Sequence, residues 1–292
     1  MNSVMETTAS ARNIASSIIA LPPLPATAQK ILACFGDDFI DAELVSSIVE
    51  CDAAICAKLL GLANSAYYGL AEPVHKIRDV ISRVLGVDTV RSLVLAMAIQ
   101  QSFDSKKCPA FDVHRFWKQS IWTAECCKKI AAVDSLISDG GRELAYTAGL
   151  CHNLGLMALA YIESIRTNSV LRAHSSTEAE PGKLSELLMA ELDTDHRSVT
   201  VELAKAWSLP GLMIAAYQQR LVAETNNDER LGLIVASAAA AVGNLEVEDE
   251  HKTELSAWAG EIGLAAEDLQ HMAVFGERQR EQVLTLASSM SV

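Results

Sequence analysis

The sequence predicts an all-helical protein, and three observations support this fold class. Apolar residues make up 50% of the 292 residues, so the chain can bury a sizeable core. Aromatic residues make up only 5%, which disfavours a β-sandwich. Apolar side chains recur near the 3.6-residue helical period, as at Val90, Leu93, Val94 and Met97, and no convincing strand pattern occurs.

Local start and stop signals place the helices. The proline-rich stretch 21–25 must end a short helix expected at 11–19, and Pro25 suits the first turn of the next helix. Asp41 and Asp52 are typical N-caps, because a short carboxylate can accept hydrogen bonds from the first free backbone N–H groups. They predict helices at 42–49 and 53–63. Further helices are expected at 77–85, 88–103, 111–132, 142–163, 184–192, 196–207, 211–221 and 230–242.

A polar loop at 104–110 suggests how the chain is organised. We expect a tail with a helix at 1–17 and a main domain at 18–222. This domain would contain an N-terminal helical lobe at 18–103 and a second lobe at 111–222. Residues 223–292 are expected to form a helical extension that packs on the same core.

Charge and cysteine content exclude several classes of protein. The formal charge of −13 opposes sequence-independent binding to nucleic acid, because the phosphate backbone is also negative. Seven cysteines without a C-x-x-C pair, at positions 34, 51, 56, 108, 126, 127 and 151, are typical of reduced thiols. We expect the adjacent Cys126 and Cys127 to pack in the core. No signal peptide and no run of 18 apolar residues occurs, so we expect a cytoplasmic protein that does not span a membrane.

Several motifs in order resemble the HDOD family. They are LPPLP at 21–25, IVECDAAI at 48–55, LANSAYYG at 62–69, ISRVLG at 81–86 with VRSL at 90–93, AGLCHNLG at 148–155, and DH at 195–196 followed by WSLP at 207–210. Each motif alone is weak, but their order and spacing together are specific. The resemblance covers roughly residues 18–222. It implies an HD-domain-like multi-helix bundle with an N-terminal helical lobe, and a signalling or regulatory role in bacteria.

The same resemblance implies a metal site that has lost its ligands. An HD phosphohydrolase holds divalent metal with imidazoles and carboxylates, and the metal activates a water. The family's His–Asp pair falls on His152 and Asn153, so an amide replaces the carboxylate. The upstream histidine position falls on Gln119, and a later histidine position falls on Gln218 and Gln219. With His196, these six residues form the candidate pocket. We expect no bound metal and no other cofactor.

Two interpretations of this pocket remain open. The amides and imidazoles can satisfy one another across the helix interface, or they can bind a small polar ligand such as a nucleotide. A non-catalytic signalling scaffold is therefore the leading hypothesis. A metal-dependent phosphohydrolase with an atypical site and a nucleotide-binding sensor without turnover are the alternatives.

Other candidate sites have ordinary structural explanations. Asp195 is expected to cap a helix rather than to bind metal with its neighbours. Trp117, Trp122 and Trp207 are expected in the core. The densest basic group could dock an acidic signalling partner, although a solvated helix face is the simpler interpretation. Its members are His75, Lys76, Arg78, Arg83 and Arg91.

Overall fold

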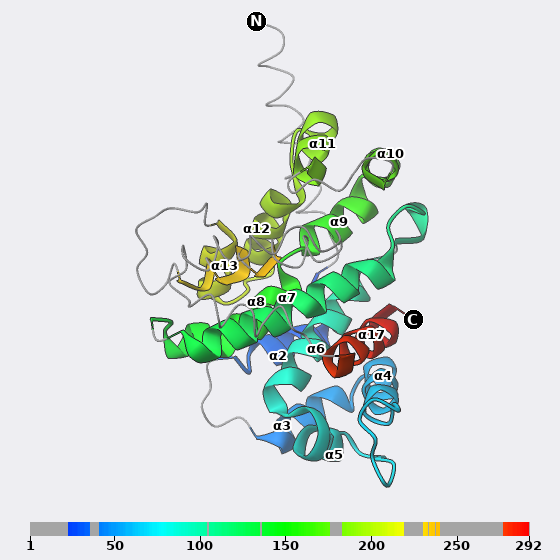
Figure 1. The fold of residues 1–292 in the computed structure, drawn as a ribbon, viewed down its shortest axis with the longest axis vertical. Helices are drawn as coiled ribbons and strands as arrows, with labels where there is room; N and C mark the ends of the chain where they lie inside the picture. Colours follow the sequence, from blue (N-terminus) through cyan, green and yellow to red (C-terminus); the bar gives the residue numbers. More distant parts are fainter. Residues whose placement is uncertain are drawn as a thin grey trace, which may run out of the picture.

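Every secondary-structure element in the described part of the chain is a helix (Figure 1). The computed structural model describes residues 23–35, 41–103, 105–134, 136–175, 183–218, 230–232, 234–236, 238–239 and 277–291. The expected all-helical fold class is therefore confirmed. The expected helix at 11–19 lies outside these residues, and most of the expected helix at 230–242 does too.

The first group of helices precedes residue 103. Its members are α2 (Ala26–Leu32), α3 (Ala42–Val49), α4 (Ala53–Ala63), α5 (Ile77–Asp79), the π-helical segment η1 (Val80–Leu85) and α6 (Val87–Gln100). The two predicted N-caps are confirmed. The Asp41 side chain accepts a hydrogen bond from the backbone N–H of Leu44, and Asp52 accepts from the N–H groups of Ala54 and Ile55.

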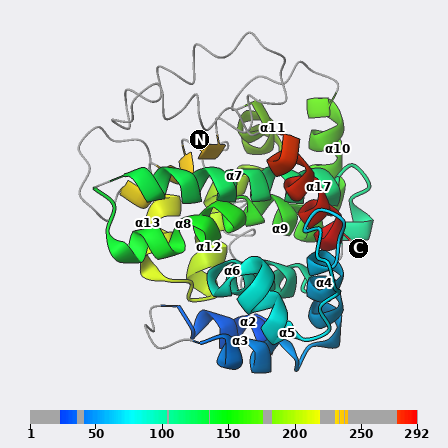
Figure 2. The ribbon, with the colours of Figure 1, turned by 60° about the horizontal axis from the view of Figure 1, so that its bottom comes forward.

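The second group contains the longest described helix, α7. Its members are the short 3-10 turn η2 (Ser105–Lys107), α7 (Val113–Val133), α8 (Asp139–Cys151), α9 (Leu154–Ile162), α10 (Ser164–Ser175), α11 (Lys183–Leu192), α12 (His196–Ala206) and α13 (Gly211–Gln218). The C-terminal helix α17 (Glu277–Ser291) packs against α7 and α4. Figures 1 and 2 both show α17 beside these two helices.

Helices α7 and α8 pack directly against each other in the core. Gly149 makes this close contact possible, because a Cβ at that position would lie 2.7 Å from the Cα of Ala124. Cys126 and Cys127 on α7 are free thiols and buried, as expected. Trp117 is fully buried, and Trp122 and Trp207 are partly buried against the core.

The predicted single helix at 142–163 is wrong. Helix α8 begins earlier than expected, at Asp139, because the Ser138 side chain caps it by accepting a hydrogen bond from the N–H of Gly141. The stretch 142–163 is also broken in the middle, where Asn153 leaves the helical conformation with φ −116° and ψ 17°. The break separates α8 from α9 and places His152 and Asn153 in the turn between them.

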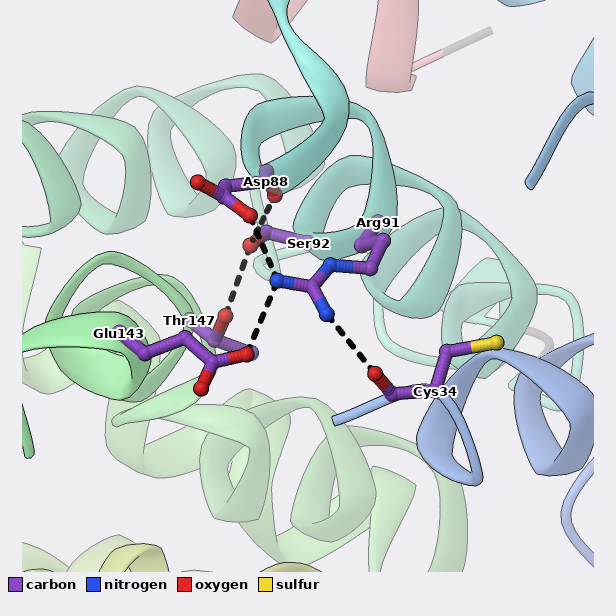
Figure 3. A network of polar contacts seen from close by, with 6 residues as sticks. All are labelled: Cys34, Asp88, Arg91, Ser92, Glu143 and Thr147. Atoms are coloured by element: carbon purple, nitrogen blue, oxygen red, sulfur yellow. Dashed lines mark hydrogen bonds and ion pairs between the residues drawn. The ribbon is translucent and has the colours of Figure 1, made fainter. Parts of the chain in front are cut away.

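A buried arginine joins the two groups of helices (Figure 3). Arg91 on α6 donates to the carbonyl of Cys34, which follows α2, at 2.8 Å. It also forms ion pairs with Asp88 at 2.6 Å and with Glu143 on α8 at 3.0 Å. Beside it, the hydroxyls of Ser92 and Thr147 lie 2.7 Å apart. These contacts connect α2, α6 and α8 through polar groups.

None of the helices in the described part of the chain combines the length and the apolar character needed to cross a bilayer.

Candidate functional site

The turn between α8 and α9 lies against the first turn of α12. Gly155 makes the contact, because a Cβ there would lie 1.9 Å from the His196 carbonyl oxygen and 2.6 Å from the Thr200 nitrogen. The Gly155 N–H donates to Thr200 Oγ1 at 2.9 Å, and that hydroxyl donates to the His196 carbonyl at 2.9 Å. A glycine and a threonine thus fix His152 and Asn153 close to His196.

His152 is held as a neutral imidazole. Its Nδ1 lies 2.7 Å from the Gly149 carbonyl oxygen, so Nδ1 carries the proton and Nε2 is left as an acceptor. Burial lowers the pKa of His152 to about 4, although the Gly149 carbonyl acts in the opposite direction. The charge of Arg197 lowers it further. At neutral pH this side chain carries no charge, and its Nε2 can accept a hydrogen bond.

His196 is the first residue of α12 and is also neutral at pH 7. Burial lowers its pKa to about 4 against the attraction of Asp195. Arg197, His152 and His174 lie close enough to lower it as well. The Nδ1 atom of His196 is buried and has no hydrogen-bond partner. One buried ring nitrogen of this pocket is therefore unused within the described structure.

The carboxylate of Asp195, which precedes His196 in the sequence, caps α12. Asp195 accepts from the Ser198 N–H at 2.8 Å and from the Ser185 hydroxyl at 3.0 Å. Burial alone would raise its pKa, but these hydrogen bonds and His196 hold the pKa of Asp195 below its ordinary value. The expected N-cap at Asp195 is confirmed.

Asn153 supplies the third polar group of the pocket. Its Oδ1 atom is buried and lacks a hydrogen-bond partner. A buried carbonyl oxygen without a donor costs about 1–3 kcal/mol, so this atom is suited to accept a hydrogen bond from a bound molecule.

The structure brings three of the six predicted pocket residues together, namely His152, Asn153 and His196. Gln119 is half-buried on α7, where its backbone carbonyl accepts from the Thr123 hydroxyl at 2.9 Å. Gln218 has an exposed side chain at the end of α13. Gln219 lies outside the described residues.

The pocket residues do not fit the metal centre that the motifs imply. Within the described ranges, no group of three or more His, Cys, Asp or Glu side chains is placed to hold a metal ion. His152 and His196 are imidazoles, but the residue after His152, where the HD motif has a carboxylate, is the amide Asn153. Hard divalent cations prefer carboxylates, and an amide neither neutralises their charge nor serves as a base.

Sequence patterns missed two groups that shape the pocket. Thr200 bonds to Gly155 and to His196, but a threonine within a helix gives no signal of such a role. Arg197 is exposed and affects both imidazoles through its charge. Its position next to the DH motif was the only available indication.

The predicted basic group is divided by burial. His75, Lys76, Arg78 and Arg83 are exposed, and Arg78 forms an ion pair with Glu43 at 2.8 Å. The prediction that Arg91 belongs to this surface group is wrong, because the residue is only 4% exposed. Its guanidinium is held by the interhelical contacts of Figure 3. Arg91 cannot take part in docking at the surface.

The helical fold, with a His–Asn turn between α8 and α9 packed on α12, defines an HD-type helical domain. The chain belongs to the HDOD family, since residues 21–220 match the sequence model of the HDOD domain. The predicted family resemblance is thereby confirmed.

Known relatives are similar over much of the chain. An uncharacterized protein from Treponema pallidum (strain Nichols) is 26% identical over 212 residues, which cover 70% of this chain and 38% of that protein. The crystal structure of a candidate signal transduction protein from Marinobacter aquaeolei VT8 has 24% identity and a TM-score of 0.79, covering 98% of this chain and 66% of that one. A candidate phosphohydrolase from Shewanella amazonensis SB2B has 20% identity and a TM-score of 0.71, covering 94% and 97%.

These similarities differ in what they establish. The two solved structures are less than 25% identical to this chain, so their similarity concerns the fold. The chain spans 38% of the Treponema protein and 66% of the Marinobacter chain, so both of those proteins contain segments beyond the shared part.

Proposed function

We propose that this chain is a regulatory HDOD domain that acts through contacts with signalling proteins and does not catalyse hydrolysis at its HD-type pocket. The observation that carries the proposal is the chemistry of the turn between α8 and α9. An amide, Asn153, stands where an HD hydrolase needs a carboxylate next to the histidine. His152 remains, but its Nδ1 is already bonded to the Gly149 carbonyl.

The electrostatics of the pocket support the same proposal. Both imidazoles have a pKa of about 4 because burial disfavours the charged form. The nearby carboxylate of Asp195 is engaged by Ser198 and Ser185. Among the described residues, no three His, Cys, Asp or Glu side chains are placed to hold a metal ion that would activate an attacking water.

The comparisons supply the signalling part of the proposal. The Marinobacter protein that shares this fold carries a name in signal transduction. The Shewanella protein carries a name in phosphohydrolysis, so the fold alone does not separate the two activities. The distinction rests on the pocket residues of this chain. Buried free thiols such as Cys127 and Cys151 are consistent with action in the reducing cytoplasm.

Hydrolysis of a phosphodiester tests the proposal. Purified wild-type protein and the His152→Ala variant are assayed with a chromogenic phosphodiester in Mn²⁺ and in Mg²⁺. We expect no turnover above the protein-free control in either sample. Turnover by the wild type that His152→Ala abolishes would establish an atypical phosphohydrolase and would refute the regulatory proposal.

A second candidate function is the binding of a small polar ligand without turnover. It is favoured by two buried polar atoms that have no hydrogen-bond partner in the described structure, Asn153 Oδ1 and His196 Nδ1. A thermal-shift screen of nucleotides tests it, because a ligand that binds only the folded state raises the melting temperature. A shift that is lost in Asn153→Ala would support a sensor, and no shift with any nucleotide would count against it.

A further inference from the structure

Ser120 on α7 carries a buried hydroxyl that has no hydrogen-bond partner within the described structure. The residue is only 1% exposed. A serine or threonine inside a helix often donates to the backbone carbonyl four residues earlier, as Thr123 does to Gln119 at 2.9 Å. Among the buried serines and threonines of the described ranges, all except Ser120 have a partner of this or another kind. The Ser120 hydroxyl is therefore available to a group outside its own helix.

Helices α7 and α8 lie side by side, and their register shows what Ser120 faces (Figures 1 and 2). Their contacts run antiparallel, because each step toward the N-terminus of α7 is matched by a similar step toward the C-terminus of α8. These contacts join Ala131 with Arg142, Lys128 with Tyr146, and Ala124 with Gly149. One further turn along the same register places Ser120 opposite His152 and Asn153, where α8 ends.

Ser120 also lies on the face of α7 that points toward α8. A Cβ at Gly149 would lie 2.7 Å from the Ala124 Cα and 2.8 Å from the Cys127 Sγ, so these two residues mark that face. Ser120 precedes Ala124 by four residues, and Trp117 precedes Ser120 by three, which continues the same stripe along the helix. The Trp117 indole Nε1 is likewise buried without a hydrogen-bond partner in the described structure. Two unused polar groups of α7 thus lie on the side that faces the end of α8.

Asn153 completes this side of the junction. It stands at the N-cap position of α9, yet its side chain forms no cap hydrogen bond. Asparagine is among the best N-cap residues, and Asp112, Ser138 and Asp195 cap their helices in this chain. The buried Oδ1 of Asn153 is thus not used by its own helix, and the buried Nδ1 of His196 is unused as well within the described residues.

The inner polar site consists of these four atoms, Trp117 Nε1, Ser120 Oγ, Asn153 Oδ1 and His196 Nδ1. The close packing of Gly155 on the His196 carbonyl brings the last two residues together. The indole N–H is a donor, the amide oxygen is an acceptor, and the hydroxyl and the imidazole can act as either. None of the four groups is charged at pH 7, since burial lowers the pKa of His196 to about 4. An ion buried among them would lack a counter-charge, so the site favours an uncharged ligand.

We propose that the inner polar site binds an uncharged group that carries hydrogen-bond donors and acceptors side by side, of the kind presented by the base of a nucleoside. This inference rests on the second candidate function, the binding of a small polar ligand, and names the part of the ligand that the pocket recognises. A donor of the base would reach Asn153, an acceptor would reach Trp117, and Ser120 would bond to either. Any charged part of the ligand would stay outside, near the exposed Arg197.

Calorimetric titration of the full chain tests the site. The uncharged probes are adenosine, guanosine, cytidine and uridine, and the charged probe is inorganic phosphate. Ser120→Ala removes the unpartnered hydroxyl. Thr123→Val is the matched control, because it removes a buried hydroxyl of the same helix that is already bonded to the Gln119 carbonyl. Urea denaturation without ligand shows that both variants fold, and Ser120→Ala should be at least as stable as wild type because no hydrogen bond is lost.

We expect at least one nucleoside to bind wild type and Thr123→Val with affinities that agree within about threefold. Ser120→Ala should bind the same nucleoside about tenfold more weakly, because the ligand group that bonded to the hydroxyl is left buried without a partner. Inorganic phosphate should not bind. Equal affinities of Ser120→Ala and Thr123→Val would overturn the proposal.

Two other results would also overturn it. If no nucleoside binds, an ordered water at most bridges these atoms. If phosphate binds and its binding is lost in Asn153→Ala, while no nucleoside binds, the pocket recognises charge instead of a base. This last result would leave the binding of a small polar ligand standing, so it separates a failure of this inference from a failure of the second candidate function. Hydrolysis of the phosphodiester decides the regulatory proposal independently.

Discussion

Gly155→Ala should be one of the most damaging single-methyl substitutions in this chain. The added Cβ would lie 1.9 Å from the His196 carbonyl oxygen and 2.6 Å from the Thr200 nitrogen. Both are backbone atoms of α12, so no side-chain rotation can relieve the clash. The N-terminal end of α9 must move away from α12, and this movement breaks the hydrogen bond from Gly155 to Thr200.

The expected cost has two parts. Overpacking in a core costs about 1–3 kcal/mol, and the lost hydrogen bond adds about 1 kcal/mol. We expect a loss of about 2 to 4 kcal/mol in the free energy of unfolding. This corresponds to about 4 to 16 °C in melting temperature for a chain of this size. Urea denaturation followed by circular dichroism measures the first quantity, and calorimetry measures the second.

Gly61→Ala is the matched control. Gly61 lies within α4, and nothing is within 4 Å of a Cβ built there. Alanine favours a helix over glycine by about 0.5–1 kcal/mol, so this variant should be as stable as wild type or slightly more stable. A Gly155→Ala variant as stable as Gly61→Ala would refute the close contact between α9 and α12, and with it the placement of His152 beside His196.

Two further predictions concern buried ionisable side chains. Arg91→Met should lower the free energy of unfolding by about 2 to 4 kcal/mol, because the Cys34 carbonyl and Glu143 lose their donor. Substitution of an exposed arginine, Arg83→Met, should stay within about 0.5 kcal/mol of wild type. Equal stability of the two variants in urea would contradict the contacts of Figure 3. In the folded state His152 and His196 have pKa values of about 4, below the value near 6.5 in the unfolded state. Between these two pH values the unfolded state binds more protons than the folded state. Stability therefore falls as the pH is lowered from 6.5 to 4. Between pH 7 and pH 5 the loss in the free energy of unfolding should be about 2 kcal/mol for each histidine. The His152→Gln substitution should remove about half of the combined loss. An unchanged pH dependence of stability in that variant would show that His152 is not a buried neutral group.

Features that depend on neighbouring residues could be predicted from the sequence. Asp41 and Asp52 cap their helices because the N–H groups that they bind lie two or three residues away. The pairing of His152 with His196 could be predicted only from the resemblance to the HDOD motifs. Periodicity gives no information about two residues that are 44 positions apart.

Features that depend on distant contacts could not be predicted. The apolar stretch at 142–163 has helical periodicity throughout, but packing of Gly155 on α12 accompanies a break at Asn153. The sequence groups Arg91 with exposed basic residues, because a count of charges along the chain does not include the surroundings of each side chain. The partners of Arg91 are the Cys34 carbonyl, 57 residues earlier, and the Glu143 carboxylate, 52 residues later.

The metal content of the purified protein tests the central claim most directly. Wild type and Asn153→Asp are incubated with Mn²⁺ or Zn²⁺ and desalted, and metal per chain is measured by elemental mass spectrometry. Because an amide stands beside His152 and the described residues include no three-ligand group, we expect wild type to retain well under one equivalent. One equivalent of metal per wild-type chain, lost in His152→Ala, would contradict the account.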